Sequence, residues 1–371
     1  MGRNAMIDRR LFTNIDWTLT ALALVICLVG IANIYSASFS YAPVGDPYFI
    51  KQFYWLFFGL FVAVAVCCVD YHLLEDFSYW LYGFVLFLLL MVLLFGRTSM
   101  GATRWLNLGL FSLQPSEPMK IVVIVTFARF FSRFHADGGM TVRDVLIPLA
   151  ILAVPAMLIM KQPDLGTATL VILIAFSMAF YVGLRWSTVV TFALVTIPLV
   201  WFSWAQLLRP YQKNRVLDFL NPERSRLGSG YHIIQSKIAV GSGGFLGKGY
   251  IKGTQSQLRF LPEQHTDFAF SVFAEEWGFI GCLILIALYL CLVLWGLNIA
   301  RRCNDRFGSL LAMGVTAMLF WHIVINMGMV IGLFPVVGVP LPFFSYGGTS
   351  MITSMVGIGI LQSISMRRFM F

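Results

Sequence analysis

Long apolar runs, separated by short polar segments, dominate the chain. Ten runs are long enough to form helices that cross a bilayer, because about 20 helical residues span its hydrocarbon core. They lie at residues 18–38, 52–69, 74–95, 115–133, 145–161, 165–184, 187–207, 268–298, 308–334 and 346–366. The pattern therefore predicts an all-α integral membrane protein, a polytopic bundle of about ten transmembrane helices.

Composition points the same way. Of the 371 residues, 59% are hydrophobic and only 12% are charged, which is more apolar surface than a water-soluble domain can hide. Ten helices leave no room for a large soluble domain, so we expect residues 1–371 to form a single transmembrane domain. The six cysteines have neither a disulfide-type nor a metal-ligand spacing, so no metal site is expected.

The positions of Lys and Arg predict the orientation, because short cytoplasmic loops are enriched in both. With a cytoplasmic N-terminus, twelve basic residues of short segments lie inside and four lie outside. The inner residues are Arg3, Arg9, Arg10, Arg129, Arg133, Arg143, Arg185, Arg301, Arg302, Arg306, Arg367 and Arg368, and the outer ones are Lys51, Arg97, Arg104 and Lys161. An even number of spans makes both termini cytoplasmic. The net charge of +9 then serves orientation and anionic lipids rather than nucleic acid.

One long polar segment, at about 208–267, separates the seventh and eighth predicted helices. It is basic and rich in glycine, and the topology makes it a large extracytoplasmic loop, of a length that escapes the charge rule. Residues 231–240 have the pattern of a short amphipathic helix on the membrane surface. A loop of this charge suits an anionic substrate.

Most unusual polar residues fall in or beside loops of the predicted outer face. Glu117 and Lys120, three residues apart at the start of the fourth helix, either form an ion pair that fixes helix packing or line a polar cavity; ionisable groups inside a membrane favour the cavity. Asp164 is either the N-cap of the sixth helix or a site residue. The segment 334–348, rich in Pro and Gly, should fold back into the bundle, where irregular backbone is covered.

Asp267 lies where the basic loop meets the eighth helix, after Glu263 and His265. A carboxylate there could take a proton from a reacting hydroxyl while Arg and Lys side chains hold an anion. It could equally cap the helix, and the helix dipole would then lower its pKa, which works against a base. His265 is expected to be an oriented neighbour rather than a metal ligand, because no second histidine lies near it.

Six separated motifs follow one another along the chain. They are RWL at 104–106, QPSE at 114–117, QPDLGT at 162–167, GYHIIQS at 230–236, LPEQHTDF at 261–268 and FSYGG at 344–348. Together they resemble the SEDS family of bacterial cell-wall proteins over nearly the whole chain. Residues 253–258 and 274–276 are closer to its RodA branch than to FtsW, the division paralogue.

The resemblance implies a peptidoglycan glycosyltransferase in the bacterial cytoplasmic (inner) membrane. Its extracytoplasmic active site would polymerise lipid II into β-1,4 glycan strands for cell elongation and rod shape. An α-linked pyrophosphate donor that becomes a β-linked glycan requires inversion, which needs a base and stabilisation of the leaving pyrophosphate. By family match Asp267 is the base, and Arg215 and Lys237 are candidates to hold pyrophosphate. The other substrate-binding candidates are Arg104, Trp105, Glu117, Lys120, Asp164, Glu263, His265 and Ser345.

The resemblance also implies partners and leaves alternatives open. A divalent cation, Mg²⁺ or Mn²⁺, could assist, but the sequence shows no protein-only ligand set. Besides lipid II, the implied partners are a class B penicillin-binding protein that supplies transpeptidation, membrane proteins of the elongation machinery, and membrane lipids. The alternatives are a lipid II flippase or transporter, which should carry a polar path through the bilayer midplane, a docking partner of another wall enzyme, and a division-type paralogue.

Overall fold

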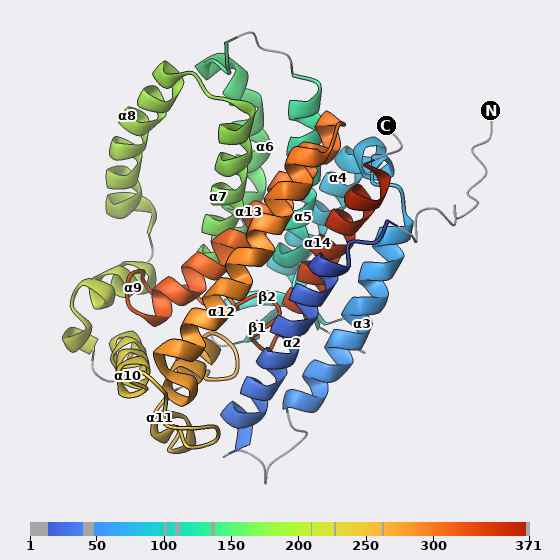
Figure 1. Ribbon diagram of the computed structural model, residues 1–371. Coiled ribbons are helices and arrows are strands. Elements are labelled where there is room, and N and C mark those ends of the chain that lie inside the picture. The colour runs from blue at the N-terminus through green and yellow to red at the C-terminus, as the bar shows by residue number, and fades with distance from the viewer. Residues whose placement is uncertain are drawn as a thin grey trace.

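A computed structural model describes residues 14–39, 48–99, 102–107, 112–134, 138–208, 210–225, 228–261 and 263–368, and most of them are helical (Figure 1). The long helices are α2 (Trp17–Ser38), α3 (Tyr48–Cys68), α4 (His72–Phe95), α5 (Ser116–Ser132), α6 (Val142–Lys161), α7 (Leu165–Val182), α8 (Trp186–Phe202), α12 (Ala269–Arg302), α13 (Arg306–Val330) and α14 (Gly348–Arg367). The shorter elements are β1 (Arg97–Ser99), β2 (Ala102–Asn107), β3 (Ser112–Leu113), the π-helix η2 (Ser203–Leu207), α9 (Pro210–Leu220), the 3₁₀-helix η3 (Pro222–Ser225), α10 (Ser229–Ser242) and α11 (Thr254–Gln257).

Nine helices of the described residues are long and apolar enough to cross a membrane, one fewer than the sequence predicts. Residues 115–133 form α5, which is one residue too short to be counted among the nine. This helix has 17 residues, so it is about 25 Å long at 1.5 Å per residue. Nearly all of its side chains are buried, and it packs against α4, α7 and α13 rather than facing lipid. An apolar run therefore marked a helix in the protein interior, which periodicity alone does not distinguish from a lipid-facing span.

The helical membrane fold is as predicted, and three short strands are the described β-structure that the sequence did not predict. Between α4 and α5, β1, β2 and β3 form an antiparallel sheet in that order, with Arg97 opposite Trp105 and Leu106 opposite Leu113. Strands of two to six residues hold too few positions for a period-two pattern to be recognised. The sheet matters for function because β2 carries Arg104 and Trp105.

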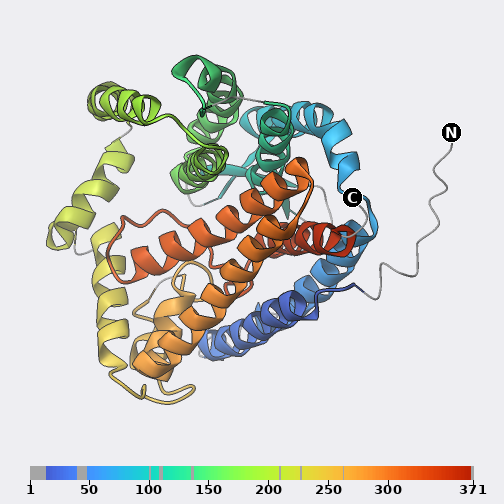
Figure 2. The same cartoon turned by 45° about the horizontal axis from the view of Figure 1, so that its top comes forward.

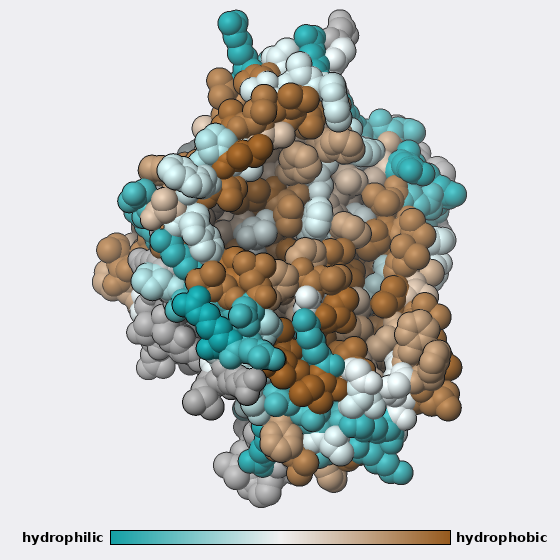
Figure 3. Space-filling model, turned by 90° about the vertical axis from the view of Figure 1, so that its left-hand side faces the viewer, coloured by the Kyte–Doolittle hydropathy of each residue, from teal (hydrophilic) through white to brown (hydrophobic). Residues whose placement is uncertain are grey.

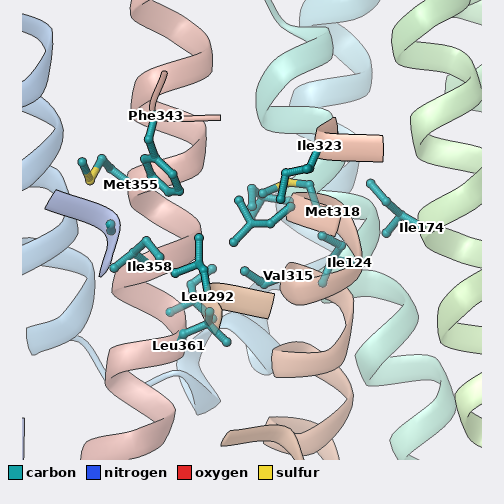
Figure 4. Close-up of a cluster of buried hydrophobic side chains, with 14 of the residues drawn as sticks. Ile124, Ile174, Leu292, Val315, Met318, Ile323, Phe343, Met355, Ile358 and Leu361 are labelled. Atoms are coloured by element: carbon teal, nitrogen blue, oxygen red, sulfur yellow. The ribbon is translucent and has the colours of Figure 1, made fainter. Parts of the chain in front are cut away.

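The centre of the bundle is α13, which contacts α5, α7, α12 and α14 (Figures 1 and 2). Figure 4 shows aliphatic side chains from α5, α7, α12, α13 and α14 meeting around it. Small residues let these helices approach closely: a Cβ on Gly314 would lie 2.4 Å from Ile124, and one on Gly296 would lie 2.4 Å from Thr316. Close van der Waals packing of this kind is what joins helices in lipid, where the hydrophobic effect does not.

The outer surface and the two ends of the bundle differ in polarity. Apolar side chains cover the middle of the face seen in Figure 3, and hydrophilic ones gather toward its ends, as expected for a membrane protein. The helices α9, α10 and α11 lie at one end of the bundle, opposite the end where α2 begins and α14 finishes (Figure 1). Within the predicted extracytoplasmic loop, residues 231–240 form part of α10, so their predicted helix is confirmed.

The glycine-rich part of the 208–267 segment is built into a break in α12. At Gly278 (φ 65°, ψ −162°) the helix is interrupted, and residues 243–249 enter the gap. Two N–H groups of this segment donate to α12 carbonyls at 3.0 Å, and two N–H groups of α12 donate to segment carbonyls at 2.9 and 3.2 Å. A Cβ on Gly243 or Gly247 would lie 2.1 Å from an α12 carbonyl oxygen, so the approach requires glycine.

A buried carboxylate ties the same region together. Glu275 on α12 accepts hydrogen bonds from Lys248 Nζ at 2.7 Å, from Thr254 Oγ1 at 3.1 Å and from the backbone N of Gln255 at 3.0 Å. These donors satisfy a charge that would otherwise be costly to bury. The first turns of α12 are thereby fixed to Lys248 and to the start of α11.

The segment between α13 and α14 is irregular and folds back into the bundle, as predicted. A Cβ on Gly30 of α2 would lie 2.6 Å from the Cα of Phe344, and a Cβ on Gly166 of α7 would lie 2.5 Å from the carbonyl oxygen of Val337. Leu341 and Phe344 are buried. The segment therefore lies between α2 and α7, and we call residues 334–347 the re-entrant segment.

Candidate active site

Asp267 lies at the start of α12 and faces the re-entrant segment. It is half-buried, and a Cβ on Gly338 (φ 67°) would lie 3.2 Å from its Oδ2. The N-cap of α12 is Phe268, and no side chain caps this helix, so Asp267 is not the helix cap that the sequence left open. Glu263, one turn earlier, accepts a hydrogen bond from Thr266 Oγ1 at 3.2 Å.

Four other charged residues act on the Asp267 carboxyl: Glu263, Asp164, Arg104 and Arg215. Burial, assisted by the negative charge of Glu263, raises the pKa of Asp267 to about 6, while the two arginines act in the opposite direction. A carboxyl with this pKa is ionised at neutral pH and is more basic than an ordinary aspartate. Distant parts of the sequence thus meet where a proton could be accepted beside positive charge.

Arg104 reaches from β2 to the turn between α6 and α7. It donates to the carbonyl oxygen of Pro163, and its Nη1 lies 3.8 Å from Asp164 Oδ1. Its Nε is buried and has no hydrogen-bond partner among the described residues. The guanidinium group therefore keeps donor capacity that an anionic ligand could use. Trp105, the next residue of the strand, is half-buried.

Asp164 is the N-cap of α7. Its carboxylate accepts hydrogen bonds from the backbone N of Thr167 at 3.3 Å, from Thr167 Oγ1 at 2.9 Å and from Gln114 Nε2 at 3.2 Å. The capping role that the sequence allowed is therefore present. Arg104 binds the same turn, so the cap also fixes the position of the groups that bind this arginine.

The two cations proposed for pyrophosphate lie in different surroundings. Arg215 on α9 donates to the carbonyl oxygen of Val336 at 3.2 Å, which joins α9 to the re-entrant segment beside Asp267. Lys237 on α10 is exposed, and its Nζ would lie 2.6 Å from a Cβ on Gly332, just past the end of α13. A cation at a helix C-terminus is stabilised by the helix dipole.

His265 and Ser345 join the start of α12 to the re-entrant segment. The His265 ring stacks on Tyr48, with centroids 4.1 Å apart, and its carbonyl oxygen accepts from the backbone N of Tyr346 at 2.9 Å. Burial lowers the pKa of His265, so its ring is neutral at pH 7. Ser345 Oγ accepts from the backbone N of Leu341 at 3.0 Å. These contacts give both residues a role in shaping the site.

A second charged group is enclosed in the bundle. Lys120 Nζ lies 2.8 Å from Glu117 Oε1 and 2.7 Å from His322 Nε2, and Lys120 is only 1% exposed. His322 Nδ1 lies 2.8 Å from the carbonyl oxygen of Met318, so Nδ1 carries the proton and Nε2 accepts from the ammonium group. The predicted pair thus has a third member and joins α5 to α13.

Sequence reasoning missed two polar residues of α13. His322 binds Lys120, and Asn326, one turn further on, donates to the carbonyl oxygen of Asp267. The available signal was their spacing of four residues within an otherwise apolar span, since polar side chains inside a membrane are rare and usually have partners. Neither residue lies in the six motifs.

The described residues determine whether the protein alone could hold a divalent cation. They include no group of three or more His, Cys, Asp or Glu side chains that could hold a metal ion. The carboxylates around Asp267 therefore do not form a protein-only ligand set for Mg²⁺ or Mn²⁺.

Known proteins share this sequence and fold. The family model for the cell cycle proteins FtsW, RodA and SpoVE matches residues 16–369. The chain is 46% identical over 315 residues to peptidoglycan glycosyltransferase MrdB of Escherichia coli K12, with 84% of each chain covered. It is 33% identical to peptidoglycan glycosyltransferase RodA of Treponema pallidum, with 96% of this chain and 98% of the other covered.

A solved structure agrees. One chain of a peptidoglycan synthase complex, whose structure concerns the coordination of polymerization and crosslinking, matches with a TM-score of 0.82 at 35% identity, over 96% of this chain and 99% of that one. The family model, the relatives and the fold point to one conclusion. This chain belongs to the SEDS family, the family of FtsW, RodA and SpoVE.

Proposed function

We propose that the chain is a peptidoglycan glycosyltransferase of the RodA type, which polymerises lipid II during cell elongation. The single observation that carries the mechanism is that Asp267 faces the re-entrant segment to which Arg215 binds, while the charge of Arg104 also acts on its carboxyl. The 46% identity to MrdB of Escherichia coli K12 supports the elongation type.

Asp267 is the general base in this proposal. Its carboxylate takes the proton of the acceptor sugar hydroxyl while that oxygen bonds to the anomeric carbon of the donor. The bond from this carbon to the pyrophosphate oxygen breaks, and the lipid pyrophosphate leaves with the electron pair. One such displacement converts an α-linked donor into a β-linked glycan, so no covalent intermediate is required. A pKa of about 6 lets Asp267 be ionised before the reaction and accept a proton during it.

Arg104 and Arg215 stabilise the pyrophosphate. Charge-assisted hydrogen bonds from guanidinium groups suit phosphate oxygens, and the buried Nε of Arg104 is a donor with no partner among the described residues. Lys237 on α10, whose side chain lies near Gly332 just past the end of α13, would contact a lipid headgroup rather than the leaving pyrophosphate. Trp105, Asp164, Glu263, His265 and Ser345 shape the surroundings of these groups, while Glu117 and Lys120 support α5 from inside the bundle.

The proposed site faces the outside of the bacterial cytoplasmic membrane. The distribution of basic residues supports cytoplasmic termini, and α9–α11 lie at the opposite end of the bundle from the start of α2 (Figure 1). Lipid II presents its sugars at the outer headgroup level in this proposal, which is where Asp267 would lie. The similarity to a chain of a synthase complex supports a partner, which we propose is a class B penicillin-binding protein.

Purified protein incubated with lipid II tests the function directly. Glycan polymer is expected in detergent, without any partner protein. Translocation of lipid II across vesicles without polymer would instead identify a flippase. Neither activity, in a preparation that is folded, would favour a docking partner of another enzyme.

Polymerisation should depend on pH through Asp267. Because the base must be ionised and its pKa is raised to about 6, kcat/KM should be constant above roughly pH 7 and fall tenfold per pH unit well below 6. The measurement is initial polymerisation rate from pH 4.5 to 8 at low lipid II concentration. An acid limb near pH 4, the ordinary aspartate range, would contradict the buried environment of this carboxyl.

Arg215→Ala should weaken lipid II use, because it removes a charge-assisted contact with pyrophosphate. We expect KM for lipid II to rise by roughly tenfold, with a smaller rise for Arg215→Lys, which keeps the charge but not the planar fork. The measurement is the lipid II dependence of polymerisation in detergent at fixed salt. Arg224→Ala, an exposed arginine on η3, is the matched control. An unchanged KM in both Arg215 variants would contradict the proposed contact between Arg215 and the pyrophosphate of lipid II.

A further inference from the structure

One buried amide joins the two segments that form the proposed site. Asn326 on α13 is 0% exposed, and its Nδ2 donates to the carbonyl oxygen of Asp267 at 3.0 Å and to that of Val339 at 2.7 Å. The first acceptor belongs to the turn before α12, and the second belongs to the re-entrant segment. Both N–H groups of the amide are therefore available to hold these two segments at a fixed separation.

This separation sets the surroundings of the Asp267 side chain. Gly338, next to Val339, is the residue that the Asp267 carboxylate faces, with 3.2 Å between Oδ2 and a Cβ built at Gly338. Neither segment is helical at this point, so helix hydrogen bonds do not fix their carbonyl groups. Irregular backbone inside a membrane bundle depends on side chains for its hydrogen bonds. Asn326 supplies them at the residue that bears the base.

The asparagine is used as a donor only. Its Oδ1 is buried and has no partner among the described residues. Asn33 on α2 repeats this arrangement: its Nδ2 donates to the carbonyl oxygen of Ala269 at 2.9 Å, and its Oδ1 also lacks a described partner. A buried acceptor without a partner costs stability. The two asparagines that hold the start of α12 therefore lower the stability of the fold in this respect, which indicates a role other than stability.

We propose that Asn326 is a positioning residue, which holds the backbone of Asp267 against the re-entrant segment so that the carboxylate meets the acceptor hydroxyl in a reactive geometry. This inference rests on the proposed role of Asp267 as the base. Asn326 acts through Asp267 and binds no lipid II itself, so its loss should affect kcat rather than KM. Small displacements of a reacting group are costly, because the reaction requires alignment of the attacking atoms.

The test compares Asn326→Leu, which keeps similar volume without a donor, with Asn326→Ala. We expect kcat for lipid II polymerisation to fall roughly 10- to 100-fold in both, with KM changed by less than about twofold. Asn326→Ser retains one O–H donor and should lose less. Thr316→Val is the matched control: Thr316 is buried on the same helix, but its Oγ1 donates to Ala312 of that helix, and its kcat should be unchanged.

The pH profile of kcat/KM distinguishes a positioning role of Asn326 from a purely structural one. If the turn bearing Asp267 is released, the carboxyl gains solvent, its pKa falls from about 6 toward that of ordinary aspartate, and the acid limb of kcat/KM moves to lower pH. A loss of folded protein would lower the rate without moving this limb. The positioning role is overturned if kcat per folded molecule is that of the wild type, or if kcat falls while the limb stays in place.

The two proposals fail in different ways. If Asp267→Asn still polymerises lipid II, the base role is wrong, whatever the Asn326 variants do. If Asp267→Asn is inactive while Asn326→Leu and Asn326→Ser are both fully active, only the positioning role is wrong. If Asn326→Leu does not fold, Asn326→Ser, which keeps a donor, still tests the positioning role.

Discussion

Asp267→Asn is expected to leave the protein folded and to lower lipid II polymerisation by about 10²- to 10⁴-fold, the usual loss on removal of a general base. The amide has nearly the same size as the carboxyl but cannot accept the proton. Stability should not fall: the folded pKa is raised to about 6, so ionised Asp267 disfavours the fold above that pH, and a neutral side chain removes this cost.

The measurement is glycan synthesis per folded molecule, together with Tm in the same detergent. Glu223→Gln removes a carboxylate from an exposed residue of η3 and should polymerise as the wild type does. Asp267→Ala should match Asp267→Asn in activity. Near-normal synthesis by either Asp267 variant would rule out the proposed mechanism.

Lys120→Met is expected to have the largest effect on stability. It leaves the Glu117 carboxylate without its partner at 2.8 Å and His322 Nε2 without its donor at 2.7 Å, inside the bundle. Removing one member of a buried pair typically costs about 3–5 kcal/mol, because an uncompensated charge stays buried. Tm in detergent and the yield of folded protein measure this loss. Lys248→Met should cost less, because Lys248 is 28% exposed and its partner Glu275 keeps other donors.

Two double variants separate pairing from geometry. Glu117→Gln combined with Lys120→Met removes both charges and should recover much of the lost stability. Exchanging the charges, Glu117→Lys with Lys120→Glu, should not rescue, because a carboxylate at position 120 would face the acceptor nitrogen of His322. A charge exchange with wild-type Tm and activity would show that His322 is not a required partner.

The sequence by itself determined most of the helices and the family, and it supplied the candidate site residues. Apolar runs predict transmembrane helices because a helix forms all backbone hydrogen bonds within its own segment, as lipid requires. The apolar pattern that marks each helix also lies within that segment. Asp267 was conspicuous as a carboxylate between a basic loop and an apolar span, and the resemblance added Arg104 and Arg215 as candidate substrate-binding residues. The irregularity of the re-entrant segment followed from its Pro and Gly content, and the structure confirms that it folds into the bundle.

Only the tertiary structure decided which of these residues meet. The apolar run at 115–133 forms α5, which is mostly surrounded by other helices, and an apolar run by itself does not show whether lipid or protein surrounds it. Arg215 binds the re-entrant segment beside Asp267 while Lys237 lies near Gly332, just past the end of α13, although both come from one basic loop.

The polar contacts inside the bundle could not be predicted for the same reason. Lys120 and His322 are 202 residues apart, and Asn326 and Asp267 are 59 apart. A single sequence carries the period of each helix but not the rotation that turns one polar side chain toward another. That rotation is fixed by packing of the whole bundle, in which α13 is central.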